Sequence, residues 1–289
     1  MSTASMEIEP MAYRQWPQAY RCRAGAAEMV VVADIGPRIL DLRWKGGGNL
    51  LYEDTTGFGR KDWRLYGGHR LTVAPEGEES YLADNQPCVV TVRSGRLSLQ
   101  TTGGASEIRR ELVIMGPNDG AGFELLHVLT NDGKRPWRGA AWAITCVPHS
   151  ELAAPCGRVR CWPGTERSDW TFARGGLAGA PRTRRGKIGW HSLNSWLAAL
   201  QPQATLVIHH PDPAALEDCV DDGCNVEVFA CPDYIELETL GSNAWISPGQ
   251  SVIHRQRWRL LDPGLTPSDC PTIAARAGCF APKLHAHER

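Results

Sequence analysis

Short runs of alternating apolar and polar residues recur along the chain, separated by residues typical of turns. EMVVVADI at 28–35 is followed by Gly-Pro, and RILDLRW at 38–44 ends before three glycines. Residues 88–102 form two alternating stretches about Ser94-Gly95, which predicts a β-hairpin. The pattern continues through TLVIHH, CNVEVFA, YIELETL and SVIHRQRWRLL to residue 261. Many short strands joined by frequent turns predict an all-β sandwich or barrel.

Helical periodicity is weak throughout. Residues 194–201 and 212–220 could each give a turn or two of helix, but no long amphipathic pattern supports a parallel βαβ sheet. Residues 153–189 are rich in Gly, Arg and Pro and are interpreted as a long loop over the sheet or a partly mobile segment. We predict a single β domain over residues 1–262 and a peripheral C-terminal tail over 263–289.

Charge and hydropathy limit the kinds of binding partner that the sequence supports. Lys plus Arg total 31 against 32 for Asp plus Glu, which gives no electrostatic case for binding nucleic acid or an anionic membrane. The longest apolar runs are too short to cross a bilayer, and the N-terminal segment lacks the apolar core of a secretory signal. We therefore expect no nucleic-acid or membrane partner and a cytoplasmic location.

Ten cysteines are present in a chain of 289 residues. Cys219, Cys224 and Cys231 follow His209 and His210, but their spacings are not those of paired zinc-binding knuckles. In a large chain without an export signal, reduced and mostly buried thiols are the favoured interpretation. No metal site is predicted.

The stretch YIELETL carries two carboxylates on one face of an expected strand. Glu236 and Glu238 are two residues apart, so their Cα atoms lie roughly 7 Å from each other. Like charges at that distance, partly desolvated, raise one of the two pKa values and create a candidate general acid or base. The alternatives are that both lie on a wet outer face or pair with Arg255, Arg257 or Arg259.

The stretch YGGHRLTVAPEGEES from residue 66 places a histidine and an arginine after two glycines. The glycines permit close backbone approach to a ligand. His69 is a candidate proton donor, or a turn histidine satisfied by backbone. Arg70 offers a planar fork for hydroxyls, carboxylate or phosphate, or forms a salt bridge to Glu76 or Asp84. Glu76 completes the same expected wall of a pocket.

An ordered set of motifs resembles the galactose-mutarotase-like superfamily, most closely an uncharacterised bacterial branch of it. The resemblance covers about residues 28–261. The closing elements are LET at 237–239, a Pro-Gly turn at 248–249 and WRL at 258–260. The earlier ones are GPRIL (36–40), NLLYED (49–54), YGGHRL (66–71), APE (74–76), DNQP (84–87), LTN (129–131), WAIT (142–145) and ELETLG (236–241).

The resemblance implies a large antiparallel supersandwich in which the concave face of one sheet forms a carbohydrate site. In aldose mutarotases, a glutamate at the LET position removes the proton of the anomeric hydroxyl while a histidine protonates the ring oxygen. This implies Glu238 as the base. The strand that carries the acid histidine corresponds to GAAWAIT at 139–145, which contains Trp142 and no histidine. His69 is therefore the best substitute for the acid.

The predicted function is that of a carbohydrate-active protein of aldose 1-epimerase type, without a cofactor, acting on a small-molecule sugar as a monomer or homodimer. Two alternatives stay open: a non-catalytic carbohydrate-binding protein, and an acid/base epimerase, lyase or cyclase that acts on a pathway intermediate. A phosphate-specific variant requires Arg70 together with Lys187 or Arg185. The candidate substrate-binding residues are Arg70, Glu76, Trp142 (a sugar-stacking platform or a core residue), Lys187 (a ligand for an anionic group) and Glu236.

Overall fold

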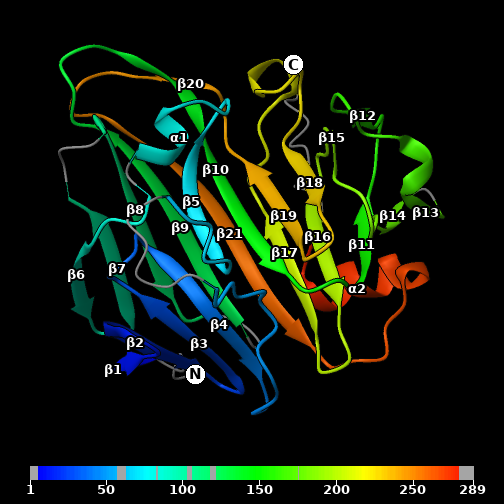
Figure 1. The fold of residues 1–289 in the computed structure, drawn as a ribbon, viewed down its shortest axis with the longest axis horizontal. Helices are drawn as coiled ribbons and strands as arrows, with labels where there is room; N and C mark the ends of the chain where they lie inside the picture. The colour runs from blue at the N-terminus through cyan, green and yellow to red at the C-terminus, as the bar shows by residue number, and fades with distance from the viewer. Residues whose placement is uncertain are drawn as a thin grey trace, which may run out of the picture.

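Two antiparallel β-sheets lie one over the other and enclose the main apolar core between them (Figure 1). This confirms the predicted all-β, two-sheet architecture. The helices are short: α1 (Glu79–Leu82), α2 (Cys270–Ala277) and the 3-10 turns Arg167–Asp169, Leu216–Asp218 and Pro267–Asp269. None of these helices is long and apolar enough to cross a membrane. The computed structural model describes residues 6–56, 63–82, 84–102, 106–117, 122–174 and 176–279.

Each sheet has its own strand order. The 11-stranded sheet comprises, in spatial order, β1 (Glu7–Tyr13), β2 (Trp16–Ala24), β3 (Ala27–Val32), β4 (Arg38–Trp44), β5 (His69–Ala74), β10 (Trp137–Val147), β19 (Ile235–Leu240), β18 (Val226–Ala230), β15 (Gly186–Trp190) and β12 (Arg160–Cys161), with β20 (Ala244–Ile246) paired to β10. The 10-stranded sheet comprises β13 (Thr171–Ala173), β14 (Gly176–Gly179), β11 (Glu151–Pro155), β16 (Ser195–Leu200), β17 (Thr205–His210), β21 (Ser251–Leu261), β9 (Gly122–Asn131), β8 (Ile108–Met115), β7 (Arg96–Thr101) and β6 (Cys88–Arg93).

Side-chain alternation in β19 divides the first sheet into two faces. Ile235 and Leu237 point into the core between the sheets. Because successive side chains in a strand point to opposite sides, Glu236 and Glu238 point to the outer face. The predicted sharing of one face by these two glutamates is therefore confirmed.

The strand register aligns residues of five strands across that outer face. Arg70 on β5 is opposite Ile144 on β10, which is opposite Glu238 on β19. Glu238 is in turn opposite Glu227 on β18, and Glu227 is opposite Gly189 on β15. We call these five residues the outer-face row. It brings together polar groups that lie far apart in the sequence.

Two local expectations differ from the structure. Residues 194–201 do not form a helix but contain β16, which pairs with β11 and β17 and is buried along its whole length. Pairing on both edges and burial on both faces outweigh a weak helical propensity. Residues 153–189 are not one loop, because short strands, β11 to β15, occupy much of the segment.

The segment after the last strand packs on the outer face of the 10-stranded sheet. Ile273 and Ala277 on α2 are buried against Trp196, Ala198 and other residues of that sheet. This tail, expected to be peripheral, thus covers an apolar surface that β16 and its neighbours would otherwise expose to water.

The two glycines before β5 serve the fold. Gly67 and Gly68 both have positive φ. A Cβ on Gly67 would lie 2.2 Å from the carbonyl oxygen of Tyr52, and one on Gly68 would lie 2.0 Å from that of Ile39. The two glycines therefore allow close approach to the backbone of Tyr52 and Ile39, whereas the sequence predicted close approach to a ligand. The ten cysteines, also as predicted, are free thiols, most of them buried.

A chain of histidines crosses the core behind the outer-face row. His69 Nε2 lies 2.8 Å from His127 Nε2, and His69 Nδ1 lies 2.9 Å from Thr145 Oγ1. His127 Nδ1 lies 3.1 Å from the carbonyl oxygen of His254, so that nitrogen carries the proton. In the neutral ring, which burial favours, His127 Nε2 then accepts a hydrogen bond from His69 Nε2. With both rings neutral, one tautomer of each satisfies these contacts.

The chain of histidines continues along the inner face of the second sheet, where His254 lies in phase with Trp258 and His210 with Ile208. His254 Nε2 lies 2.7 Å from Thr239 Oγ1, and the rings of His254 and His210 have centroids 4.2 Å apart. Burial lowers the pKa of His69 and of His254 well below the ordinary value, and that of His127 and His210 to about 4. These rings are stable only in the neutral form, which makes the network sensitive to acid.

The substitution His127→Gln tests this sensitivity. Unfolded His127 protonates near 6.5 but folded His127 only near 4, so the unfolded chain binds more protons as pH falls between these values. Wild type therefore loses stability from this group on acidification, whereas H127Q does not. We expect the difference in free energy of unfolding between wild type and H127Q to shrink by about 2 kcal/mol from pH 7.5 to pH 5. Urea unfolding at both pH values measures it.

A control variant removes buried volume from the same strand without removing a titrating group. Leu125→Ala destabilises by about 2–5 kcal/mol, and its difference from wild type stays constant between the two pH values because leucine does not titrate. A constant difference for H127Q as well would contradict the assignment of a neutral, acid-sensitive network.

Candidate functional site

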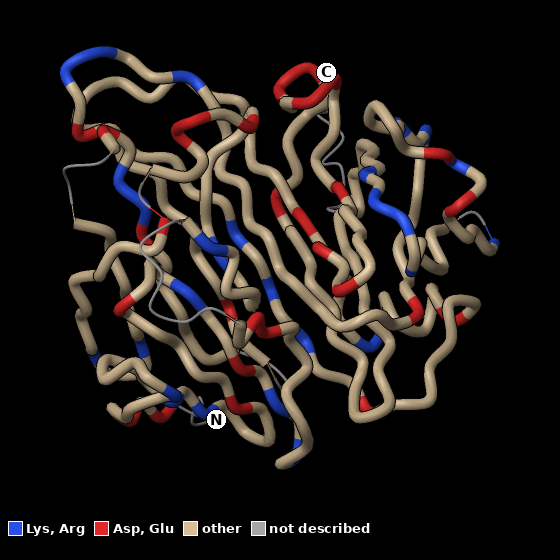
Figure 2. Tube along the Cα trace, viewed as in Figure 1, with Lys and Arg blue, Asp and Glu red and all other residues tan. Residues whose placement is uncertain are grey.

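A lysine ammonium lies between two buried carboxylates on the outer face. Lys187 Nζ lies 2.6 Å from Glu227 Oε2 and 2.9 Å from Glu238 Oε2. Both glutamate side chains are completely buried, and that of Lys187 is 15% exposed. Figure 2 shows acidic positions on the neighbouring strands β18 and β19, with a basic position on β15. Three ionisable groups are thus gathered where little water reaches them.

A glycine on β15 makes room for this cluster. Gly189 is the member of the outer-face row opposite Glu227. A Cβ at this position would lie 3.0 Å from Glu227 Cγ, 3.0 Å from Cys224 Sγ and 3.1 Å from the ring of Trp162. These contacts are tighter than ordinary packing, so a side chain here would push Glu227 or Cys224 aside.

Trp142 fixes the orientation of Glu238. Its indole Nε1 donates a hydrogen bond to Glu238 Oε2 at 2.6 Å. Lys187 Nζ lies 4.5 Å from the centroid of the Trp142 ring and 5.2 Å from that of Trp162, within cation–π range. Trp142 is only 5% exposed. Of the two interpretations of this residue, a packed position that supports the carboxylate fits the geometry better than an open stacking platform.

Two carboxylate oxygens at the centre of the site have neither a hydrogen bond nor an ion-pair contact from the described residues. These are Glu238 Oε1 and Glu227 Oε1. Burial raises the pKa of Glu227 well above its ordinary value, with Lys187 opposing and Glu238 adding to the shift. Burial alone would lower the pKa of Lys187, but the two carboxylates raise it. Buried polar atoms are nearly always hydrogen-bonded, so the two oxygens are suited to the hydroxyls of a ligand.

Glu236 lies one pleat along β19 from Glu238, in a different environment. Its Oε1 accepts a weak hydrogen bond from Cys146 Sγ at 3.7 Å. Burial raises the pKa of Glu236 to about 7; the charge of Glu238 adds to the shift and that of Arg70 opposes it. The predicted raising of one pKa in this pair thus occurs at Glu236. Near neutral pH this carboxyl is present in both protonation states, as a proton donor or acceptor requires.

Arg70 reaches the same face but is already paired. Its guanidinium donates a hydrogen bond to Asp84, which also accepts one from Trp63 Nε1 at 3.0 Å and lies 3.5 Å from Arg38. Burial would raise the pKa of Asp84, but the charges of Arg70 and Arg38 outweigh it and hold that pKa below its ordinary value. Of the partners weighed for Arg70, the structure selects Asp84. Glu76 is exposed and accepts a hydrogen bond from the hydroxyl of Tyr81.

His69 does not join Arg70 on the outer face. It is opposite Thr145 and in phase with Leu237, so it points into the core between the sheets. Its ring packs edge-on against Trp258 of the other sheet, with centroids 5.0 Å apart. The sequence predicted that His69 and Glu238 line the same pocket. The structure corrects this: His69 points into the core, and its neighbour Arg70 lies on the outer face with Glu238.

Sequence reasoning missed Glu227. The stretch CNVEVFA alternates in the same way as YIELETL, but only the register between β18 and β19 places Glu227 beside Glu238. The alternation of a glutamate between two valines was the one local signal. The arginines proposed as partners of these glutamates lie on the other sheet; Arg257 and Arg259, for example, pair with Glu124.

The arrangement is suited to proton transfer at a hydroxyl-bearing ligand. It combines a carboxylate held by Lys187 and Trp142 with a second carboxyl that titrates near neutrality. Among the described residues no cluster of His, Cys, Asp and Glu is arranged to hold a metal ion.

Removing the shared cation should destabilise the fold. Lys187→Met leaves the charge of Glu238 buried without its partner, which costs about 3–5 kcal/mol. We expect that loss in the free energy of unfolding measured by urea at pH 8. The double variant K187M/E238Q has no buried charge left at Glu238 and recovers most of the loss. Equal destabilisation of the single and double variants, or a loss below about 1 kcal/mol for K187M, would contradict the charge-balance interpretation.

Comparisons with solved structures identify relatives of the fold. Slr1438 from Synechocystis sp. PCC 6803 matches with a TM-score of 0.59 and 12% identity over 89% of this chain and 99% of that one. A galactose mutarotase-like protein from Clostridium acetobutylicum gives 0.57 and 10% over 89% and 99%. A galactose mutarotase related enzyme from Lactobacillus acidophilus gives 0.59 and 7% over 86% and 100%. Neither a protein-family model nor a curated protein matches the sequence.

Proposed function

The chain has the galactose-mutarotase-like fold, and on this premise we propose that it is an enzyme of aldose 1-epimerase type that interconverts the anomers of a small sugar. The observation that carries the proposal is the pair of carboxyls on one face of β19. Glu238 is held by Lys187 and Trp142, whereas the pKa of Glu236 is raised to about 7. Two carboxyls held in different environments are a recurrent acid/base pair.

The proposed reaction needs proton transfers only. Glu238 Oε1, which has no hydrogen-bond partner among the described residues, accepts the proton of the anomeric hydroxyl while protonated Glu236 donates its proton to the ring oxygen. The bond between the anomeric carbon and the ring oxygen breaks, giving the open-chain aldehyde. Rotation about the bond from C1 to C2 and closure from the other face, with both proton transfers reversed, yields the other anomer.

Neighbouring residues position these two groups in the proposal. Trp142 and Lys187 occupy Glu238 Oε2 and so direct the other oxygen to the substrate. Glu227, whose raised pKa favours the protonated form, donates a hydrogen bond to a sugar hydroxyl through its otherwise unpartnered oxygen. Arg70, paired to Asp84, acts through its charge on Glu236. Glu76, which is exposed and accepts a hydrogen bond from the hydroxyl of Tyr81, would bind substrate only from the rim of the site.

The charge pairing favours a sugar without a phosphate. Arg70 and Lys187, two of the basic groups that a phosphate site would use, are both engaged by buried carboxylates. Arg185 is exposed. A phosphate entering beside Glu238 would meet like charge before it met a free cation. We therefore propose a free aldose as substrate.

A non-catalytic carbohydrate-binding protein is the second candidate. One observation favours it: the outer face of β10 carries Ala140, Trp142, Ile144 and Cys146, and none of these can act as the histidine acid of the mutarotases. In that case the unpartnered oxygens of Glu227 and Glu238 bind sugar hydroxyls without turnover. Measuring sugar binding and anomer exchange on the same sample distinguishes the two functions.

Substitution of the proposed base gives the direct test. Anomer exchange of glucose, galactose and other aldoses, followed by saturation-transfer NMR, should be accelerated by the protein above the buffer rate. Glu238→Gln keeps the hydrogen bond from Trp142 but cannot accept a proton, and we expect it to lower the rate by about 10²–10⁴-fold.

The exposed Glu7→Gln is the control, because it removes one carboxylate far from the outer-face row. It should retain the wild-type exchange rate. No acceleration by wild type for any of the sugars would reject the enzymatic proposal, and sugar binding without acceleration would select the carbohydrate-binding alternative.

The role of Glu236 predicts the shape of the pH profile. The acid must be protonated, and its protonated fraction falls as pH rises through about 7. We expect the exchange rate, corrected for buffer, to fall about tenfold per pH unit well above pH 7. In Glu236→Gln the remaining rate should be low and lack this alkaline decline. A wild-type rate that stays constant between pH 7 and pH 9 would remove Glu236 as the acid.

A further inference from the structure

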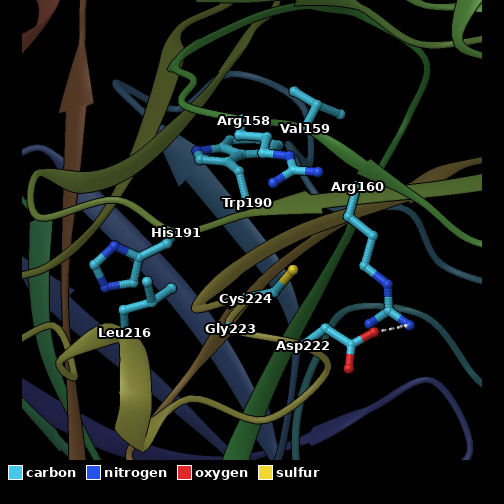
Figure 3. Close-up of a pocket in the computed structure, with 9 residues that line it drawn as sticks. All are labelled: Arg158, Val159, Arg160, Trp190, His191, Leu216, Asp222, Gly223 and Cys224. Atoms are coloured by element: carbon cyan, nitrogen blue, oxygen red, sulfur yellow. Dashed lines mark ion pairs between the residues drawn. The ribbon is translucent and has the colours of Figure 1, made fainter.

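A cavity of about 560 Å³ opens beside the edge of the 11-stranded sheet, next to the carboxylate cluster (Figure 3). Its wall is formed by β12, the end of β15 and the turn that precedes β18. A volume of this size is within the range of small-molecule sites, about 300–1,000 Å³. The mechanism proposed above makes no use of this space.

The cavity and the carboxylate cluster share a thin wall. Cys224 lines the cavity, and its Sγ lies against Gly189, which also contacts Glu227. Burial raises the pKa of Cys224 to about 12, so its thiol is a neutral wall atom and not a nucleophile. The cavity is therefore adjacent to the site around Glu238 but has its own lining.

Two arginines from one short segment border the cavity. Figure 3 shows Arg158 and Arg160 on one side and His191 and Leu216 on the other. Arg160 is held in place: it donates a hydrogen bond to the carbonyl oxygen of Asp221 at 2.5 Å and pairs with Asp222 at 2.9 Å. Its charge is thus fixed and only partly neutralised by a carboxylate that is itself largely exposed.

Arg158 differs from Arg160 in having no carboxylate partner in the described part of the chain. It is exposed on the rim. Trp190 also lines the cavity. Its side chain is 1% exposed, and its indole Nε1 donates no hydrogen bond to any described residue. A buried donor without an acceptor is costly unless a ligand or water supplies one. The guanidinium of Arg158, without a carboxylate partner among the described residues, is suited to an oxygen acceptor that carries negative charge.

We infer that this cavity is a second binding site, separate from the sugar-chemistry site, for a small organic anion. Its carboxylate or phosphate group lies between Arg158 and Arg160. Its carbon body packs against Leu216, which is 56% exposed where no ligand covers it. Charged hydrogen bonds from arginine supply the affinity, and the apolar rim favours an organic anion over an inorganic one.

The test uses three acyclic six-carbon probes: gluconate, sorbitol 6-phosphate and sorbitol. None has an anomeric carbon, so their binding is independent of any mutarotase activity. Isothermal titration calorimetry at low salt should detect gluconate or sorbitol 6-phosphate but not sorbitol, and binding should weaken as salt is added. The preferred anion identifies whether carboxylate or phosphate is recognised, and inorganic phosphate alone tests the contribution of the carbon body.

Arg158→Gln removes a side chain without a protein partner and should leave folding intact, yet weaken binding of the anionic probe about tenfold. The equally exposed Arg182→Gln is the control for net charge and should bind as wild type. Glu238→Gln should also bind as wild type if the two sites are separate. Equal affinity for sorbitol and the anions, an equal loss in R182Q, or loss of binding in E238Q would each overturn the inference.

Discussion

The charge balance at Lys187 is the constraint on which the outer face of the first sheet depends. One ammonium contacts two carboxylates that are completely buried, so each charge is tolerable only because the others are present. The raised pKa of Glu227 indicates how the balance is reached, since protonation of that carboxyl leaves one cation facing one anion. The cluster can then hold Glu238 in a fixed orientation without a net buried charge.

The strands of the outer face also contribute residues to the core. In two of them, a residue of the outer face is adjacent in sequence to a residue of the core. Glu238 precedes Thr239, which contacts His254, and Arg70 follows His69, which contacts His127. Glu238 and Arg70 are therefore each next in sequence to a polar group that is hydrogen-bonded between the sheets. Such backing limits the movement of the backbone beneath the site, as precise positioning of reactive groups requires.

The sequence predicted the strands well, because alternation and turn residues are local signals, and the face shared by Glu236 and Glu238 followed from them. What it could not supply is the register between strands distant in the chain. Only that register brings Lys187 and Glu227 to Glu238. A shift of one residue decides which face a side chain takes, and this is why Arg70, not His69, belongs to the outer face. β16 was misjudged for a related reason, since its pairing is non-local.

The same register explains how the proposed mechanism does without a histidine acid. On β10 the outer positions are apolar except at Trp142, which holds Glu238. In the proposal the proton donor therefore comes from β19 itself, one pleat away, where Glu236 stands outside the ion pairs that Lys187 forms with Glu227 and Glu238. Burial and the neighbouring charge raise its pKa to about 7, and Arg70 limits the rise. Two glutamates in one short strand thus have different surroundings: Lys187 and Trp142 contact Glu238, whereas the charges of Arg70 and Lys187 only moderate the raised pKa of Glu236.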